Sequence, residues 1–205
     1  MDTPTPATLA PTALIDSDHP DVVDFARRHA VGADERERAV ALYLAVRDGF
    51  RYDPYRVDLS PAGMRASAVV ANGYGWCVPK AALLAAAARA VGIAAREAMG
   101  TDLYLWHGYT ELWLDGAWRK ATPAFNIELC ERFGLLPLDF DGVNDSLYHP
   151  YDRAGQRHME YVNQRGSFDD MPLERIAADF VATYPRWVQR PPSAHSFADD
   201  ADREN

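Results

Sequence analysis

Residues 73–80 read GYGWCVPK and lead directly into the apolar run AALLAAAARA of residues 81–90. Alanine and leucine are strong helix formers, so this run predicts a long helix. Proline is tolerated in a first helical turn, where its missing N–H needs no partner, and Pro79 therefore places Cys77 at the helix start. The N–H groups and the dipole at that end stabilise a thiolate. Cys77 is thus a candidate nucleophile, and a small buried core cysteine is the alternative interpretation.

Around this segment the expected order is helices first and strands second. Apolar residues at helical spacing behind Asp, Ser or Pro mark the helices, and runs rich in aromatic residues mark the strands. The Asp115-Gly116 pair is typical of a two-residue hairpin. These signals predict an α+β fold in which the helix that begins at Cys77 packs on an antiparallel sheet. The expected elements are helices 22–29, 35–48, 61–71 and 77–92, strands 93–99, 103–114 and 117–122, and helices 125–133 and 172–184, with a loop-rich region over 137–172.

The charge of the chain disfavours two classes of partner. Its 205 residues include 21 basic and 30 acidic side chains, which give a formal net charge of −9. This acidic excess argues against nucleic acid and anionic membranes as the main partners. No apolar run approaches the roughly 20 residues that are needed to span a bilayer.

The two ends of the chain differ from its middle in composition. Residues 1–15 are rich in proline, threonine and alanine, and they predict a disordered lead-in that lacks the basic start of a signal peptide. Residues 16–190 are expected to form a single domain, followed by a disordered acidic tail over 191–205. With only Cys77 and Cys130, a disulfide framework is not expected, and the default compartment is the reducing cytoplasm.

A histidine follows the cysteine at a suggestive position. His107 lies thirty residues after Cys77, within the strongest predicted strand. The two-residue period of a strand places His107, Tyr109 and Glu111 on one face, with Trp106 on the other. Nucleophilic thiol chemistry needs an imidazole within hydrogen-bond reach to take the thiol proton. Packing of the helix start on the sheet brings such groups together, and a purely structural histidine is the alternative interpretation.

Three segments of the sequence carry a recognisable pattern. They are GWC at 75–77, RAVGIAAR at 89–96 and WHGYTELWLDGAW at 106–118. Together they resemble the bacterial transglutaminase-like superfamily over roughly residues 40–125. Members of this superfamily share a papain-like core, with a cysteine at a helix start, a histidine on the next strand and an aspartate on the strand after it. The resemblance implies that Cys77 is the nucleophile and His107 the base.

The resemblance also implies a reaction class. The expected reaction is acyl transfer or amide hydrolysis through a thioester intermediate, with a peptide, a protein, or a small amide or thioester as substrate. Neither calcium nor an organic cofactor is implied. Whether the acyl group passes to water or to an amine stays open, as does the oligomeric state.

One position departs from the family pattern. The aspartate of the third element would fall at Thr122, where a neutral hydroxyl supports an imidazolium less well than a carboxylate does. Asn126 is a rival partner for His107, because papain-like enzymes use asparagine in this role. Glu111 matches a support residue of the family. A degenerate site, in a domain that binds without catalysing, is the alternative function.

Three aromatic residues flank the predicted pair. Trp76 is a candidate for holding an oxyanion, together with the backbone N–H of Cys77, and Tyr74 and Trp106 are candidates for the wall of an acyl-binding groove. Core packing is the alternative role for each of them. The acidic residues within 137–145 lack the final glutamate of a helical-hand calcium loop, so an Asp/Gly-rich turn is expected there and no metal site.

Overall fold

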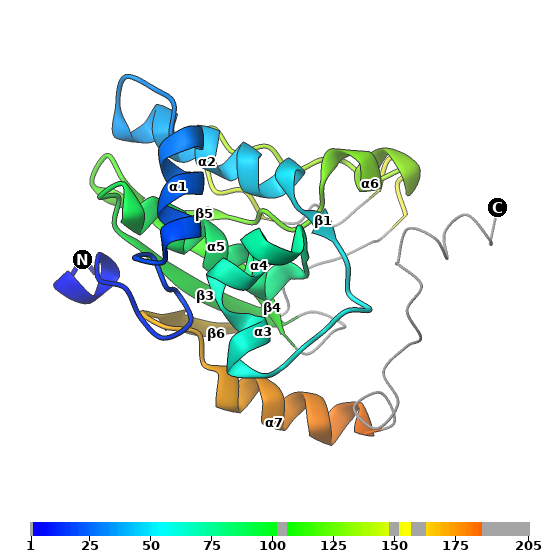
Figure 1. Ribbon diagram of the computed structural model, residues 1–205. Helices are drawn as coiled ribbons and strands as arrows, with labels where there is room; N and C mark the ends of the chain where they lie inside the picture. Colours follow the sequence, from blue (N-terminus) through cyan, green and yellow to red (C-terminus); the bar gives the residue numbers. More distant parts are fainter. Residues whose placement is uncertain (1, 102–105, 148–151, 157–162, 186–205) are drawn as a thin grey trace.

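The computed structural model describes residues 2–101, 106–147, 152–156 and 163–185 (Figure 1). Its helices are the 3-10 turn η1 (Pro6–Thr8), α1 (Pro20–His29), α2 (Glu35–Gly49), α3 (Pro61–Met64), α4 (Ala66–Asn72), α5 (Cys77–Ala90), α6 (Ile127–Arg132) and α7 (Leu173–Thr183). Its strands are β1 (Arg51–Tyr52), β2 (Tyr74–Gly75), β3 (Ala95–Thr101), β4 (His107–Leu114), β5 (Ala117–Ala121) and β6 (Asn163–Phe168).

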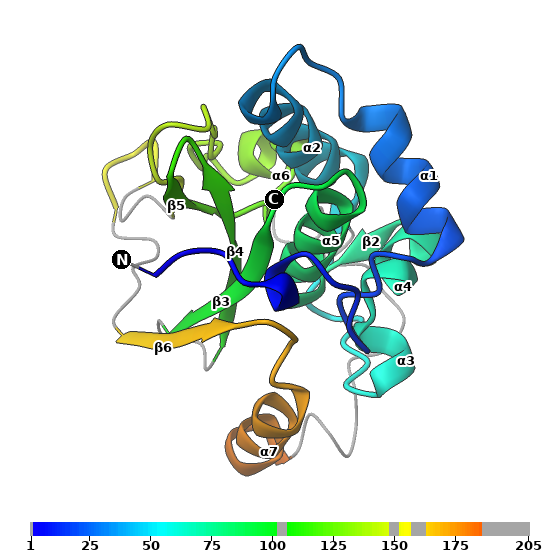
Figure 2. The ribbon, with the colours of Figure 1, turned by 90° about the vertical axis from the view of Figure 1, so that its left-hand side faces the viewer.

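The main sheet is antiparallel, and α5 packs across it. Its four strands lie in the order β5-β4-β3-β6, and a separate parallel pair joins β1 to β2 just before α5. Figure 2 shows α5 between this sheet and the helices α1 and α4. The structure thereby confirms the expected α+β fold, with the helix of the candidate nucleophile on an antiparallel sheet.

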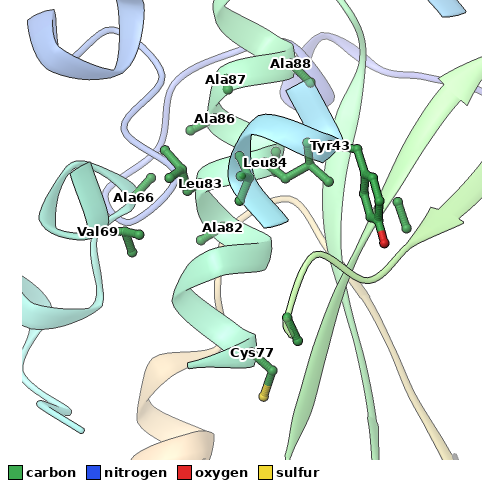
Figure 3. Packing of buried hydrophobic residues seen from close by; sticks show 14 of the residues in the cluster. Tyr43, Ala66, Val69, Cys77, Ala82, Leu83, Leu84, Ala86, Ala87 and Ala88 are labelled. Atoms are coloured by element: carbon green, nitrogen blue, oxygen red, sulfur yellow. The ribbon is translucent and has the colours of Figure 1, made fainter. Parts of the chain in front are cut away.

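The central helix α5 is buried on all sides. Every residue from Cys77 to Arg89 is buried, which is the environment expected of a helix that is apolar around its whole circumference. Ala66 and Val69 of α4 lie on one side of it and Tyr43 of α2 on the other (Figure 3). The many alanines let these neighbours approach closely, which fixes the position of the N-terminal end of α5.

The helix expected over 61–71 is divided in two. Arg65 has an extended backbone, with φ −65° and ψ 149°, so that α3 ends and α4 begins on either side of it. The cause is distant in sequence, because Asp16 accepts hydrogen bonds from the backbone N–H and the hydroxyl of Ser67 at 3.0 and 2.6 Å. This carboxylate caps the first turn of α4 and thus starts a new helix there.

The N-terminal segment makes defined contacts, which differs from the disordered lead-in expected over residues 1–15. The carboxylate of Asp2 lies 2.6 Å from the guanidinium of Arg96, and the carbonyl of Ala10 accepts a hydrogen bond from Arg89 at 2.8 Å. Residues 2–15 therefore lie along the body of the domain. The predicted tail over 191–205 falls outside the described residues.

A strand lies within the region that was expected to be loops. β6 pairs with β3 at the edge of the sheet, although its sequence NQRGSF is mostly polar and exposed. The strand expected over 103–114 begins in the structure at His107, and residues 103–105 fall outside the described part. Within the described residues, no helix combines the length and the apolar character that crossing a bilayer requires.

Candidate active site

Cys77 is the first residue of α5, as the sequence predicts. Its side chain is 2% exposed and lies at the N-terminal end of the helix (Figure 3). The sulfur lies 3.8 Å from the carbonyl oxygen of Trp106, which belongs to the peptide bond that joins Trp106 to His107. The candidate nucleophile is therefore next to the backbone of the candidate base.

Two further contacts align α5 with β4. A side chain at Gly108 would lie 2.8 Å from the Cα atom of Val78, so the absence of a Cβ lets the strand and the first turn touch. One step along, the hydroxyl of Thr110 donates to the carbonyl of Ala81 at 2.8 Å. The start of β4 thus lies along the first turn of α5.

His107 is the first residue of β4, at the strand end nearest to Cys77. It is buried, with 3% of its surface exposed, and it pairs with Gly100 of β3. Residues 108 and 110 face the helix, which agrees with the predicted alternation along this strand. The same alternation puts residue 107 on the opposite face of β4, so the observed link between the two predicted residues is the contact of the Cys77 sulfur with the carbonyl of Trp106, which directly precedes His107.

Thr122 directly follows β5 and is completely buried. Its backbone N–H donates to the carbonyl of Ser146 at 3.1 Å, and its own carbonyl accepts a hydrogen bond from the Tyr43 hydroxyl at 3.1 Å. Within the part of the chain that the structure describes, the side-chain oxygen of Thr122 has no hydrogen-bond partner. The backbone of Thr122 is therefore fixed, whereas its hydroxyl is not used.

Asn126, the rival partner for His107, is engaged with β1. Its side-chain oxygen accepts a hydrogen bond from the backbone N–H of Tyr52 at 3.1 Å. The residue is buried and precedes α6, where it forms part of the wall of a cavity of about 300 Å³. The cavity is lined by Arg51, Tyr52, Asp53, Asn126, Glu128, Leu129, Arg132 and Phe133.

Helix α7 contacts both tryptophans of the predicted groove. The ring of Trp76 lies 5.7 Å from that of Phe180, between ring centroids, and the indole N–H of Trp106 donates to Asp179 at 3.0 Å. The guanidinium of Arg165 stacks over Trp106 at 4.3 Å from the ring centroid. Both tryptophans are buried, so α7 forms part of the wall beside Cys77.

Tyr74, the third predicted aromatic residue, lies in β2 and is half-buried. The guanidinium of Arg56 lies 5.0 Å from the centroid of its ring. Arg56 in turn pairs with the buried Asp53 at 3.3 Å. Tyr74 thus borders the segment that leads into Cys77, on the side of β1.

Two buried ionisable residues near this site were not predicted. Lys80 is fully buried, and burial lowers its pKa to about 7. Glu97 of β3 is also fully buried, and neither carboxyl oxygen has a partner among the described residues; burial, with a smaller contribution from Asp170, raises its pKa well above the usual value. A charged residue inside an apolar helix is a signal for Lys80, whereas Glu97 lies in a strand of mixed composition that gives none.

Comparisons with known proteins agree with this fold. A family model described as the transglutaminase-like superfamily matches residues 23–123, a range that includes Cys77, His107 and Thr122 and ends before Asn126. The crystal structure of a candidate cysteine protease from Cytophaga hutchinsonii is similar, with a TM-score of 0.50 and 19% sequence identity over 57% of this chain. The match spans 40% of that protein, so the chain corresponds to less than half of it. No curated protein matches the chain.

Proposed function

Residues 23–123 make this chain a member of the transglutaminase-like superfamily, and we propose that it is a cysteine enzyme acting on the acyl group of an amide or thioester. One observation carries the proposal: the sulfur of Cys77, at the start of α5, lies 3.8 Å from the carbonyl oxygen that precedes His107. The family match supports it, because members of the superfamily that the sequence resembles carry a cysteine at a helix start and a histidine on the next strand.

The chemistry follows from the two side chains. The N-terminal end of α5 favours the thiolate of Cys77, and His107 holds the proton that the thiol gives up. The thiolate attacks the carbonyl carbon, and the first-turn N–H groups of the helix stabilise the negative charge that develops on the oxygen. The carbon–nitrogen bond then breaks, His107 gives its proton to the leaving amine, and a thioester on Cys77 remains.

A second nucleophile completes the cycle. Water attacks the thioester to release a carboxylic acid, or an amine attacks it to release a new amide, and His107 takes the proton of the attacking group. In this proposal Trp76 helps to hold the oxyanion, and Trp106 and Tyr74 form the wall against which the acyl group lies. The substrate is a peptide, a protein, or a small amide or thioester, and the setting proposed is the reducing cytoplasm, where a thiol stays reduced.

A second candidate function rests on Thr122. Its hydroxyl, at the position of the family aspartate, has no hydrogen-bond partner among the described residues. A site without an orienting carboxylate loses support for the imidazolium. The second candidate is therefore a binding module that keeps the fold and performs no chemistry.

Alkylation of Cys77 by iodoacetamide as a function of pH separates the two functions. The rates are measured by mass spectrometry for the wild type and for His107→Ala, with Cys130 as an internal reference in every sample. Burial raises the pKa of Cys130, so this thiol reacts slowly at low pH. An isolated thiol titrates near 8.5, whereas a thiol paired with an imidazole reacts well below pH 7.

If the protein is a cysteine enzyme, Cys77 of the wild type should be labelled fast at pH 6, and His107→Ala should abolish this fast labelling. Identical slow labelling of Cys77 in the wild type and in His107→Ala contradicts the proposed enzymatic function and favours the binding module. Transfer and hydrolysis are then distinguished with p-nitrophenyl acetate, an activated acyl donor. Faster turnover on addition of a primary amine, with formation of the amide, indicates transfer, and an unchanged rate indicates hydrolysis.

A further inference from the structure

A buried ammonium group lies one helical turn from the candidate nucleophile. Lys80 is three residues after Cys77, and its Nζ donates to the carbonyls of Arg47, Phe50 and Ala124 at 2.8, 2.7 and 2.8 Å. An ammonium has three N–H donors, so every donor of this side chain is used. A lysine with no exposed surface requires such a complete set of bonds, because burial of the charge is costly without partners.

Two of the three carbonyls belong to the end of α2. Arg47 lies in the last turn of this helix, and Phe50 directly follows it. The last carbonyls of a helix lack partners within it and carry the negative end of its dipole, so they favour a cation. The ammonium of Lys80 satisfies this end of α2; burial lowers its pKa to about 7, whereas the nearby carboxylate of Asp48 favours its charged form.

The third carbonyl connects Lys80 to the segment behind β5. Ala124 lies between Thr122 and Asn126, the two candidate partners of His107. The ladder of β4 with β5 ends at the pair Thr110 and Ala121, three residues before Ala124. The segment that carries both candidate partners of His107 is thus tied to the helix of the candidate nucleophile.

The backbone of Lys80 adds to the same link. Its N–H donates to the carbonyl of Trp76 at 3.1 Å, and this hydrogen bond closes the first turn of α5 around Cys77. The side chain of Lys80 also packs against Gly75, whose Cβ position would lie 3.1 Å from its Cγ. One residue therefore fixes the turn that carries Cys77 and contacts the strand that leads into it.

We propose that Lys80 is a positioning residue for the reaction proposed above, on which this inference rests. Its ammonium holds the first turn of α5, the end of α2 and the segment after β5 in one arrangement. This arrangement sets the distance between Cys77 and the groups around His107. Lys80 touches neither substrate nor reacting atoms, and it acts through the backbone of Ala124 and the turn of Cys77.

The test is the pH profile of Cys77 alkylation in Lys80→Met. Methionine keeps an unbranched apolar stem and removes all three donors, so the segment behind β5 loses its tie. We expect the apparent pKa of Cys77 labelling to rise by about one unit. This rise lowers the labelling rate at pH 6 about tenfold. If this variant does not fold, Lys80→Gln, which keeps two N–H donors, replaces it in the same assay.

The matched control is Ile93→Ala, at the opposite end of α5. Ile93 is buried in the same core and lies beyond the C-terminal turn of the helix, far from Lys80. Truncation of a buried isoleucine lowers stability without touching the site, so this variant reports the effect of lost stability alone. It should retain the wild-type pH profile at temperatures below its unfolding transition.

The outcomes distinguish a failure of the positioning role of Lys80 from a failure of the proposed function. A wild-type profile in folded Lys80→Met overturns the positioning role and leaves the proposed enzyme intact. Equal shifts in Lys80→Met and Ile93→Ala also overturn it, because lost stability then explains both. A wild type without low-pH reactivity at Cys77 overturns the proposed function, and this inference with it.

Discussion

The buried carboxyl of Glu97 should make the stability of the domain fall as the pH rises. Both of its oxygens lack partners among the described residues, and burial, the main cause, raises its pKa well above the usual value. In the unfolded chain this carboxyl releases its proton near pH 4.3. Between that pH and the higher folded pKa, the folded state holds one proton more than the unfolded state.

The sign and the size of the effect follow from this difference. Stability changes with pH in proportion to the protons bound in the unfolded state minus those bound in the folded state, which is negative here. Glu97 thus contributes its full stability below the unfolded pKa and loses it as the pH rises toward the folded pKa. One proton corresponds to about 1.4 kcal/mol for each pH unit in this window.

The test is urea unfolding of the wild type and Glu97→Gln at pH 5 and pH 7. Glutamine has the same shape and stays neutral. The free energy of unfolding of the variant, relative to that of the wild type, should therefore rise by up to about 2.7 kcal/mol from pH 5 to pH 7. Glu111→Gln is the matched control on the neighbouring strand. Its carboxylate bonds Arg96 and Ser167, both at 2.7 Å, so this variant should lose stability at pH 7. Parallel pH curves for the wild type and Glu97→Gln refute the argument.

Three other outcomes are expected. Gly108→Ala should destabilise the domain by about 1–3 kcal/mol, because its Cβ meets the backbone of α5 at 2.8 Å, whereas Gly49→Ala meets nothing within 4 Å and should be nearly neutral in urea unfolding. Phe180→Ala removes the ring that packs on the tryptophan beside Cys77, and it should speed iodoacetamide labelling of that thiol without a change in the apparent pKa. Thr122→Asp supplies the carboxylate of the family pattern and should raise the labelling rate of Cys77 at pH 6; an unchanged rate indicates that this position does not orient the imidazole.

Local signals were sufficient to predict the start of α5 and the central hairpin. Proline in the first turn and the alanine-rich run act within one helix, and Asp115-Gly116 acts within one turn, so no distant residue can change them. The break at Arg65 escaped prediction because the carboxylate that causes it belongs to Asp16. β6 escaped because its polar residues pair along one edge only, through backbone groups that carry no sequence pattern.

The residues of the candidate site also divide into those that local patterns predict and those that depend on distant contacts. Cys77 and His107 could be predicted because each lies in a recognisable local pattern, on a helix start and on a strand. Only their positions are confirmed here, and their roles stay predictions. The third residue could not be chosen from the sequence, because the choice between Thr122 and Asn126 depends on how the segment after β5 is held. That segment is held by Lys80, whose three acceptors lie 30 to 44 residues away in the sequence.

Two buried ionisable groups next to the candidate pair make opposite contributions to this domain. Lys80 offsets the cost of burying its charge with three hydrogen bonds, and these bonds join three separate segments around Cys77. Glu97 lies beside Gly108, with one carboxyl oxygen 3.3 Å from the Cβ position of that glycine, and it makes no compensating bond among the described residues. Lys80 therefore contributes order at the site, whereas a stabilised Glu97→Gln that keeps the reactivity of Cys77 would show that the carboxyl has no part in it.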